Sequence, residues 1–471
     1  MIMKRITFLF GFLILAEILF AIDPAVGNFS NSSLLKNANI SLLVKNTRTN
    51  EVLYELNSKK SLVTASTMKL ITTATALEKL GSDFRFETTL EVDGKIEHGV
   101  LYGNLIIRGS GDPTLGSEKI GDKNFMFKWV EAIKKLGINR INGSVIANTA
   151  IFDNQPINPK WLWEDMGNYF APGIYGLSYL DNTFRLILSS TKAGEITKVL
   201  RTEPEIEGLS IKNDVVSSNI AYDNAYFYAE PLSYSRNIRG EIPANRSEFT
   251  VKGDIPNPAL LLAQDFRAAL IKNGIEIKEL PSVECYDRTP KTKIYTHFSV
   301  PLIDIITETN ITSNNFFAEC LFKYLSVDEN NQGSNELAAK TIRSFWKQRG
   351  LSVDELFQYD GSGLSPSNAV SANFFVELLS YMNRNSKNKD VFYKTLALAG
   401  VNGTLRSFLD KTKLQGKVSA KSGTIERVKS YAGYIHLGEN SYVFCVIINN
   451  ASGKSHDVQK QVEKFLLELD L

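Results

Sequence analysis

The amino-acid sequence predicts an α+β protein in which one sheet is assembled from both ends of the chain. Near the N-terminus, two short segments at 40–45 and 51–56 flank a polar stretch, which is typical of a β-hairpin. Near the C-terminus, two β-rich apolar runs at 430–437 and 442–448 precede an amphipathic helix at 458–469. Strands at both ends with helices beside them favour a single shared sheet.

The middle of the chain is long enough to hold further domains. Residues 66–80 place apolar side chains at helical spacing, and Gly81 follows as a stop signal. Lys69 and Ser313 are separated by 313 − 69 = 244 positions, far too many for a loop, so inserted domains are expected. The insertion contains two strand-rich stretches and a predicted helix, at 90–145, 184–252 and 257–273.

Composition and charge exclude several functional classes. The 53 Lys+Arg nearly balance the 51 Asp+Glu, so no nucleic-acid or polybasic membrane surface is predicted. With 43% hydrophobic and 22% charged residues, the chain is close to the globular average. The sequence predicts no cofactor, metal site or disulfide framework, because the cysteines lie in or beside apolar stretches at Cys285, Cys320 and Cys445.

The first residues resemble an export signal. Lys4 and Arg5 precede the apolar run 6–21, and Pro24 follows shortly after it, so residues 1–21 are expected to be a secretory signal peptide. An uncleaved anchor is the weaker alternative, because the run is short and contains Glu17. The mature protein is therefore expected to be exported, and peripheral membrane association stays open.

The catalytic motifs of several hydrolase classes are missing from the sequence. None of the four histidines belongs to a GxSxG elbow or a HExxH pair. A serine enzyme can instead use lysine as its base, and Ser66-Thr67-Met68-Lys69 places the two on one helix face. An ordinary helix cap at Ser66 is the competing interpretation. The same serine–lysine spacing recurs at Ser33, Ser189, Ser344 and Ser386, so the pattern alone has little specificity.

A second candidate segment is Lys421-Ser422-Gly423-Thr424, inside an extended run. A cation and a hydroxyl there suit a substrate carboxylate, and glycine permits close approach to the backbone. The alternative is an edge strand that lysine protects from aggregation. A third candidate is Ser313-Asn314-Asn315, which precedes a helical run. Ser371-Ala372-Asn373 has the same spacing and also precedes a helix, so spacing does not choose between them.

Taken in order, the segments at 66–69, 313–315 and 421–424 resemble the SxxK, SxN and KTG motifs of the penicillin-recognising serine peptidases. Three further strings narrow the resemblance to the class C low-molecular-mass penicillin-binding proteins, the D-alanyl-D-alanine carboxypeptidases of peptidase family S13. These strings are GSGDPTL at 109–115, WLWEDM at 161–166 and DGSGLS at 360–365.

The resemblance implies a β-lactamase/transpeptidase-like catalytic domain, an antiparallel sheet flanked by helices, with two nested β-rich insertions. The catalytic domain would comprise 24–86 and 294–471. Inserted domain II would comprise 87–186 and 254–293, with domain III at 187–253 inside it.

The resemblance also implies a role for each motif residue. Ser66 would be the nucleophile and Lys69 its base, with a pKa lowered by the neighbouring cation Lys421 and by partial desolvation. Ser313 would relay the proton to the departing D-alanine, and Asn315 would bind the substrate amide. The terminal carboxylate would be held by Lys421 and Ser422 beside Gly423, and the backbone N–H groups of Ser66 and Thr424 would stabilise the oxyanion.

The remaining implications concern the substrate. Asp165 and Phe170 match residues that help to bind a diaminopimelate side chain, whereas Pro366 and Glu426 replace an expected arginine and glutamine. The implied activity is D-Ala-D-Ala carboxypeptidase, with DD-endopeptidase open, on peptidoglycan stem peptides in the periplasm, with β-lactams as inhibitors. The alternatives are a β-lactamase or esterase on the same fold, or a non-catalytic peptidoglycan-binding protein. The sequence does not indicate the oligomeric state.

Overall fold

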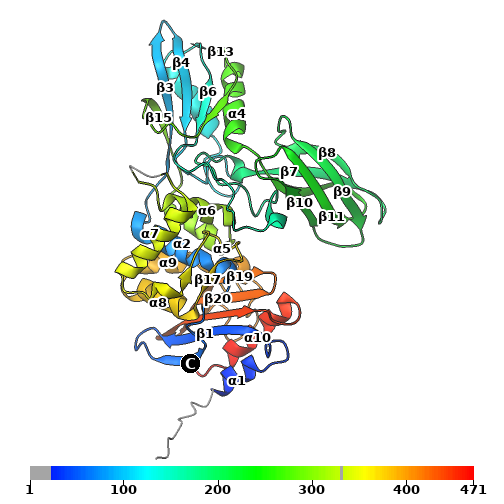
Figure 1. Ribbon diagram of the computed structural model, residues 1–471, viewed down its shortest axis with the longest axis vertical. Coiled ribbons are helices and arrows are strands. Elements are labelled where there is room, and N and C mark those ends of the chain that lie inside the picture. The colour runs from blue at the N-terminus through cyan, green and yellow to red at the C-terminus, as the bar shows by residue number, and fades with distance from the viewer. Residues whose placement is uncertain (1–22, 329–331) are drawn as a thin grey trace, which may run out of the picture.

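The computed structural model describes residues 23–328 and 332–471 and shows an elongated molecule with three parts (Figure 1). The expected signal peptide, residues 1–21, lies outside the described residues. The lower part in Figure 1 contains both ends of the described chain, and the two other parts lie above it and to its side. None of the helices in the described residues is long and apolar enough to cross a bilayer.

The lower part is built on one sheet formed by six strands of the described residues. In spatial order these are β18 (Ala397–Leu398), β19 (Val418–Ile425), β20 (Val428–Leu437), β21 (Asn440–Asn449), β1 (Asn39–Asn46) and β2 (Val52–Leu56). β1 pairs antiparallel with β21 from Asn39 opposite Asn449 to Asn46 opposite Tyr442. The predicted hairpin and the predicted pairing of the two chain ends are therefore confirmed.

Both faces of this sheet are covered by helices, which explains why its central strands are buried along most of their length. Val443, Cys445 and Ile447 of β21 pack against the larger helical layer, while Phe444 and Val446 point to the opposite face. The larger layer contains α2 (Lys69–Leu80), α5 (Leu302–Ile311), α6 (Asn315–Tyr324), α7 (Asn335–Gln348), α8 (Ala372–Arg384) and α9 (Lys389–Lys394). The other face is covered by α1 (Pro24–Ser30) and α10 (Ser455–Glu468).

The upper part, domain II, contains a second sheet, formed by seven strands of the described residues. They are β3 (Glu87–Glu97), β4 (Val100–Arg108), β5 (Arg140–Ile141), β6 (Val145–Asn148), β13 (Glu276–Ile277), β14 (Ser282–Glu284) and β15 (Thr292–Phe298). The predicted helix is confirmed as α4 (Pro258–Lys272). α3 (Phe125–Lys135) differs from the strand-rich expectation, because Phe125, Trp129 and Ile133 recur at helical spacing and are all buried. β15 pairs with β3 as far as Phe298, so the expected domain boundary at 293/294 falls inside a strand.

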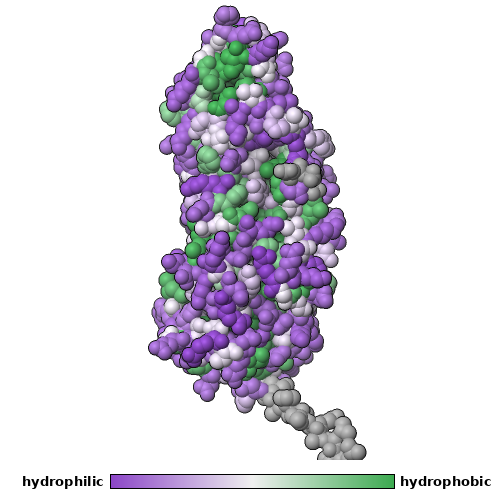
Figure 2. Space-filling model, turned by 90° about the vertical axis from the view of Figure 1, so that its left-hand side faces the viewer, coloured by the Kyte–Doolittle hydropathy of each residue, from purple (hydrophilic) through white to green (hydrophobic). Residues whose placement is uncertain are grey.

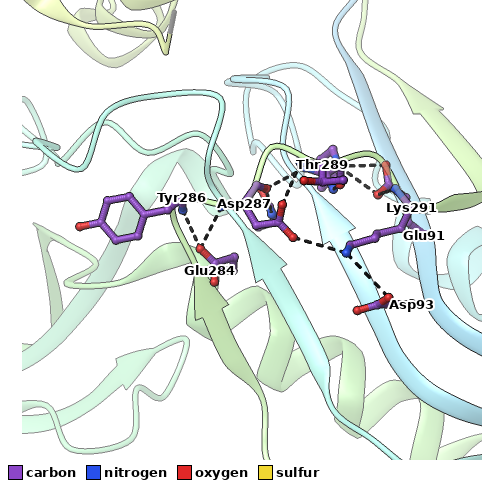
Figure 3. Close-up of polar contacts among 9 residues, drawn as sticks. Glu91, Asp93, Glu284, Tyr286, Asp287, Thr289 and Lys291 are labelled. Atoms are coloured by element: carbon purple, nitrogen blue, oxygen red, sulfur yellow. Dashed lines mark hydrogen bonds and ion pairs between the residues drawn. The ribbon is translucent and has the colours of Figure 1, made fainter. Parts of the chain in front are cut away.

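The loop that leads from β14 into β15 is tied to domain II by polar contacts (Figure 3). The Glu284 carboxylate accepts hydrogen bonds from the backbone N–H groups of Tyr286, at 2.6 Å, and Asp287, at 3.1 Å. Lys291 forms ion pairs with Asp287, at 3.6 Å, and Asp93, at 3.8 Å. This loop fixes the position from which the chain returns to the lower part.

The side part, domain III, consists of two sheets of three strands each among residues 183–254. One sheet has the order β10 (Asn224–Ala229), β11 (Ser235–Pro243), β9 (Ser210–Ser218), and the other β12 (Arg246–Asp254), β7 (Thr183–Ser190), β8 (Lys198–Glu203). The two sheets therefore begin four residues before the expected 187–253 and end one residue after it. The face of the molecule away from domain III is mainly hydrophilic, with apolar groups gathered towards its upper end (Figure 2).

Candidate active site

The first motif lies where a 3-10 turn continues into a long helix. The turn η1 (Ala65–Met68) carries Ser66, and Lys69 is the first residue of α2. The N-cap positions of the two elements are Thr64 and Met68, so Ser66 is not a helix cap. Its hydroxyl instead accepts a hydrogen bond from Lys69 Nζ at 3.0 Å.

The Lys69 side chain is buried, and its amine donates three hydrogen bonds. Besides Ser66, its Nζ donates to Asn315 Oδ1 and to the Ser362 carbonyl, each at 2.7 Å. Burial lowers the pKa of Lys69 from 10.5 to about 7, and the carboxyl groups of Glu319 and Asp360 oppose this shift. Desolvation, one of the two expected causes of the lowered pKa, is therefore its largest cause, and the burial is complete rather than partial.

Ser313 and Asn315 lie beside Lys69 and Lys421. Ser313 adopts a left-handed conformation, with φ of 62°, just before α6, and its hydroxyl accepts a hydrogen bond from Lys421 Nζ at 2.9 Å. Asn314 is the N-cap of α6, which leaves the side chains on either side of it directed to other partners. Asn315 holds Lys69 through Oδ1 and donates through Nδ2 to the Phe170 carbonyl at 2.8 Å.

The competing segment at 371–373 caps the start of a helix. Ser371 is the N-cap of α8, and its hydroxyl accepts a hydrogen bond from the Phe374 N–H at 2.9 Å. Asn373 contacts Glu355 rather than any motif residue. The tertiary structure therefore selects the segment at 313–315.

Strand β19 carries the third motif past the nucleophile. A Cβ atom added at Gly423 would lie 2.9 Å from the backbone nitrogen of Ser66 and 2.6 Å from the Thr64 carbonyl oxygen. Lys421 is completely buried, which contradicts the interpretation of an exposed lysine on an edge strand. Burial holds the pKa of Lys421 well below its usual value, and the charge of Lys69 lowers it further.

The two hydroxyl-bearing residues of the third motif point towards neighbouring side chains and solvent. Ser422 is partly exposed and donates a hydrogen bond to Thr404 Oγ1 at 2.8 Å. Thr424 is exposed, and its hydroxyl accepts a hydrogen bond from Lys429 Nζ at 3.0 Å. Both side chains remain accessible to a ligand lying along β19.

Residues that the sequence analysis did not assign support this arrangement. Glu319, one helical turn after Asn315, is buried and accepts hydrogen bonds from the backbone N–H groups of Gly361, at 3.1 Å, and Ser362, at 2.7 Å. It thus orients the Ser362 carbonyl that holds Lys69. Burial and, to a lesser extent, the charge of Asp360 together raise the pKa of Glu319 to about 8. The signal in the sequence was an acidic residue inside the apolar run 316–324.

Asp360 provides the second support. Its carboxylate accepts from the backbone N–H groups of Gly363, at 2.8 Å, and Ser365, at 2.6 Å, and from the Trp161 indole at 3.1 Å. Gly363, with φ of 81°, packs so closely on the Ala65 carbonyl that a side chain would collide with it. Trp161 and the string at 360–365 therefore form one network that packs against Ala65, the residue before Ser66.

A cavity of about 220 Å³ lies beside the second motif, and Tyr169, Phe170, Ser313 and Asn315 contribute to its lining. Phe170 is thus placed at the site. Asp165 belongs to η2 (Trp163–Asp165), where burial raises its pKa to about 6. Its role in binding substrate stays a prediction. Across residues 23–328 and 332–471, no group of three or more His, Cys, Asp or Glu side chains is placed to hold a metal ion.

The assembled groups suit acyl transfer at a carbonyl carbon. A hydroxyl lies 3.0 Å from an amine whose pKa is about 7, so the amine can accept the hydroxyl proton near neutral pH. A second buried lysine lies beside Ser313, where it can face a negatively charged ligand. These are the elements of a serine–lysine nucleophile that needs no imidazole.

Comparison with known proteins agrees with this chemistry. The model of the D-Ala-D-Ala carboxypeptidase 3 (S13) family matches residues 26–469. The D-alanyl-D-alanine carboxypeptidase DacB of Haemophilus influenzae is 26% identical over 444 residues, covering 91% of this chain and 90% of that protein. A D-alanyl-D-alanine carboxypeptidase of an Actinomadura species is 28% identical over 435 residues, covering 89% and 79% of the two chains.

The fold is also found among solved structures. Penicillin binding protein 4 of Haemophilus influenzae has a TM-score of 0.80 at 24% identity, covering 94% of this chain and 97% of that one. A second structure of that protein contains a β-lactam. The expected fold class is confirmed, and the family match over nearly the whole described chain confirms the resemblance. This chain belongs to the D-Ala-D-Ala carboxypeptidase 3 (S13) family.

Proposed function

We propose that this chain is a serine-type D-Ala-D-Ala carboxypeptidase that removes the terminal D-alanine from peptidoglycan stem peptides through an acyl-enzyme on Ser66. The observation that carries this proposal is the buried Lys69, which contacts the Ser66 hydroxyl at 3.0 Å and has a pKa of about 7. A lysine with its ordinary pKa would be protonated and unable to act as a base at neutral pH.

The acylation step follows from the positions of these groups. Lys69 takes the Ser66 proton as Ser66 Oγ attacks the carbonyl carbon between the two D-alanines. The negative charge that develops on the oxygen is stabilised by the backbone N–H groups of Ser66 and Thr424. When the C–N bond breaks, Ser313 relays the proton that Lys69 took from Ser66 to the departing amine, so Lys69 is neutral again; Lys421 holds the Ser313 hydroxyl in place at 2.9 Å. Free D-alanine leaves and an ester remains on Ser66.

Substrate binding uses the groups that face the cavity and β19. Lys421 and Ser422 bind the terminal carboxylate, and Gly423 permits the peptide to approach the strand. The amide of Asn315 uses one N–H to hold Phe170, so its second N–H remains for the substrate amide. Phe170 and Asp165 contact the side chain of the third stem residue.

The ester on Ser66 is then hydrolysed by water. A β-lactam acylates the same hydroxyl, but its opened ring stays attached and blocks the approach of water, so the adduct persists. Cleavage of cross-links between stems, an endopeptidase reaction, breaks the same type of bond and uses the same residues. The expected export signal supports a location in the periplasm of the bacterial envelope.

The test is intact-mass analysis after exposure to penicillin, followed by mapping of the modified peptide. The expected result is one covalent adduct on the peptide that contains Ser66, together with D-alanine release by the wild-type protein. Ser66→Ala should abolish both. Ser344→Ala is the matched control, because Ser344 has the same spacing to a lysine but lies exposed on α7.

Two outcomes would contradict the proposal. Unchanged D-alanine release by Ser66→Ala would exclude Ser66 as the nucleophile. Rapid turnover of a chromogenic β-lactam by the wild-type protein would identify a β-lactamase instead.

A further inference from the structure

Four aromatic side chains form one exposed surface between the active site and domain III, here called the aromatic shelf. Trp163, Tyr169 and Tyr226 are 59%, 54% and 44% exposed, and Tyr228 is partly buried. The rings of Trp163 and Tyr228 lie 5.4 Å apart. Burial raises the pKa of Tyr169, and the charges of Asp223 and Tyr226 raise it as well.

The shelf is held rigidly from behind. Asn168 bonds both backbone groups of Phe227 in β10, accepting from its N–H and donating to its carbonyl, each at 2.9 Å. Phe227 is buried, so Tyr226 and Tyr228 on either side of it point to the opposite face of the strand. A Cβ atom on Gly167 would lie 3.0 Å from that of Ala229, which shows how closely the loop docks on β10.

Packing does not account for the exposed rings. Trp161 is buried and bonds Asp360, whereas Trp163, two residues further along, leaves more than half of its surface in water. Exposed aromatic area contributes little to stability, because the hydrophobic gain scales with the apolar area removed from water. Several exposed rings gathered on one surface, rather than scattered singly, indicate a binding site.

The shelf is continuous with the active-site cavity. The rings of Tyr169 and Phe170 lie 5.5 Å apart, and both residues line the cavity together with Ser313 and Asn315. A stem peptide of about five residues spans at most roughly 18 Å when extended. The sugar that carries the stem must therefore lie within that distance of Ser66, on a surface that the cavity opens onto.

We infer that the aromatic shelf binds the glycan strand of peptidoglycan while the stem peptide occupies the cavity that Ser313 and Asn315 line. A pyranose ring has apolar C–H faces and polar edges, which matches aromatic rings that present an apolar face and, in tyrosine, a polar tip. Asp223 and Glu164 are exposed near the rings and can accept hydrogen bonds from sugar hydroxyl and acetamido groups. Arg239 lies over the ring of Tyr228 at 5.8 Å and steadies it. This inference rests on the proposed function, because that function makes peptidoglycan the substrate.

The test compares D-alanine release from a free stem pentapeptide and from the same pentapeptide attached to its disaccharide. For Trp163→Ala and Tyr226→Ala, KM for the disaccharide-linked substrate should rise roughly tenfold, while kcat and all constants for the free peptide stay unchanged. Trp163→Phe, which retains a ring, should restore most of the affinity. Phe127→Ala is the matched control, because Phe127 is 67% exposed but lies on α3 of domain II.

Two results would overturn the inference. An equal rise in KM for both substrates would assign the rings to peptide binding or to folding. The thermal unfolding midpoint of each variant would separate those two causes. An unchanged KM for both substrates would show that the shelf does not bind glycan. D-alanine release from the free peptide by the wild-type protein tests the proposed function separately, so the failure of one is distinguishable from the failure of the other.

Discussion

The pKa of Lys69 predicts how the acylation of Ser66 depends on pH. Its shift from 10.5 to about 7 is 10.5 − 7, or about 3.5 pKa units, equivalent to about 5 kcal/mol of preference for the neutral amine. At pH 7 about half of the molecules carry a neutral Lys69, compared with about one in 3,000 for a lysine with ordinary pKa. The structural cause is complete burial, which desolvates the ammonium more than Glu319 and Asp360 stabilise it.

The direction of the pH dependence follows from which protonation state of Lys69 is active. Only the neutral amine accepts the Ser66 proton, so the second-order rate constant for acylation should rise about tenfold per pH unit below pH 7 and level off above it. The assay is labelling by a fluorescent penicillin between pH 5 and 10, with circular dichroism to show that the protein stays folded. Lys429→Gln is the control, because Lys429 also has a pKa lowered by burial and lies next to Thr424. It should leave the midpoint unchanged.

A rate constant that keeps climbing with unit slope to pH 10 would refute the reasoning, because the base would then have the pKa of an exposed lysine. A midpoint that moves in Lys429→Gln would assign the titration to that residue instead.

Three further predictions concern the supporting structure. Gly423→Ala should lower acylation at least tenfold, because the added methyl meets the backbone of the nucleophile, whereas Gly416→Ala, whose methyl meets open space, should retain the rate measured by penicillin labelling. Glu319→Gln sets an amide NH₂ against a backbone N–H, a mismatch of about 1–3 kcal/mol, so kcat should fall with KM unchanged; a change confined to KM would contradict its positioning role. Arg236→Met leaves a buried carboxylate unpaired in domain III and should destabilise the protein by about 3–5 kcal/mol in denaturant unfolding, whereas Arg201→Met, in an exposed ion pair, should cause no measurable change.

Much of the catalytic domain could be predicted because its signals are local. The hairpin and the closing helix follow from the spacing of apolar side chains over a few residues, and the strand that carries Lys421 was expected from a short extended run. The inserted parts were harder to predict. Their strands are short and separated by loops, and the helix α3 lies within a stretch dominated by strand signals.

The site residues likewise divide into those that local patterns predicted and those that they did not. Spacing alone offered several serine–lysine pairs and two SxN segments that precede a helix, and each candidate also had an ordinary structural explanation. Ser371 does cap its helix, whereas Ser313 faces Lys421, and nothing in the two short strings distinguishes these outcomes. Glu319 was not predicted, because a single acid in an apolar helix reveals neither its burial nor the loop that it binds.

The sequence by itself determined the chemical groups, their order along the chain and the helix face shared by Ser66 and Lys69, because helical spacing acts over a few residues. Only the tertiary structure decided that α6 and β19 meet that face from positions hundreds of residues away, and that Lys69 and Lys421 are buried there. The physical reason is that desolvation depends on what surrounds a charge in space. The same lysine has a pKa of 10.5 in water and about 7 once three distant segments enclose it.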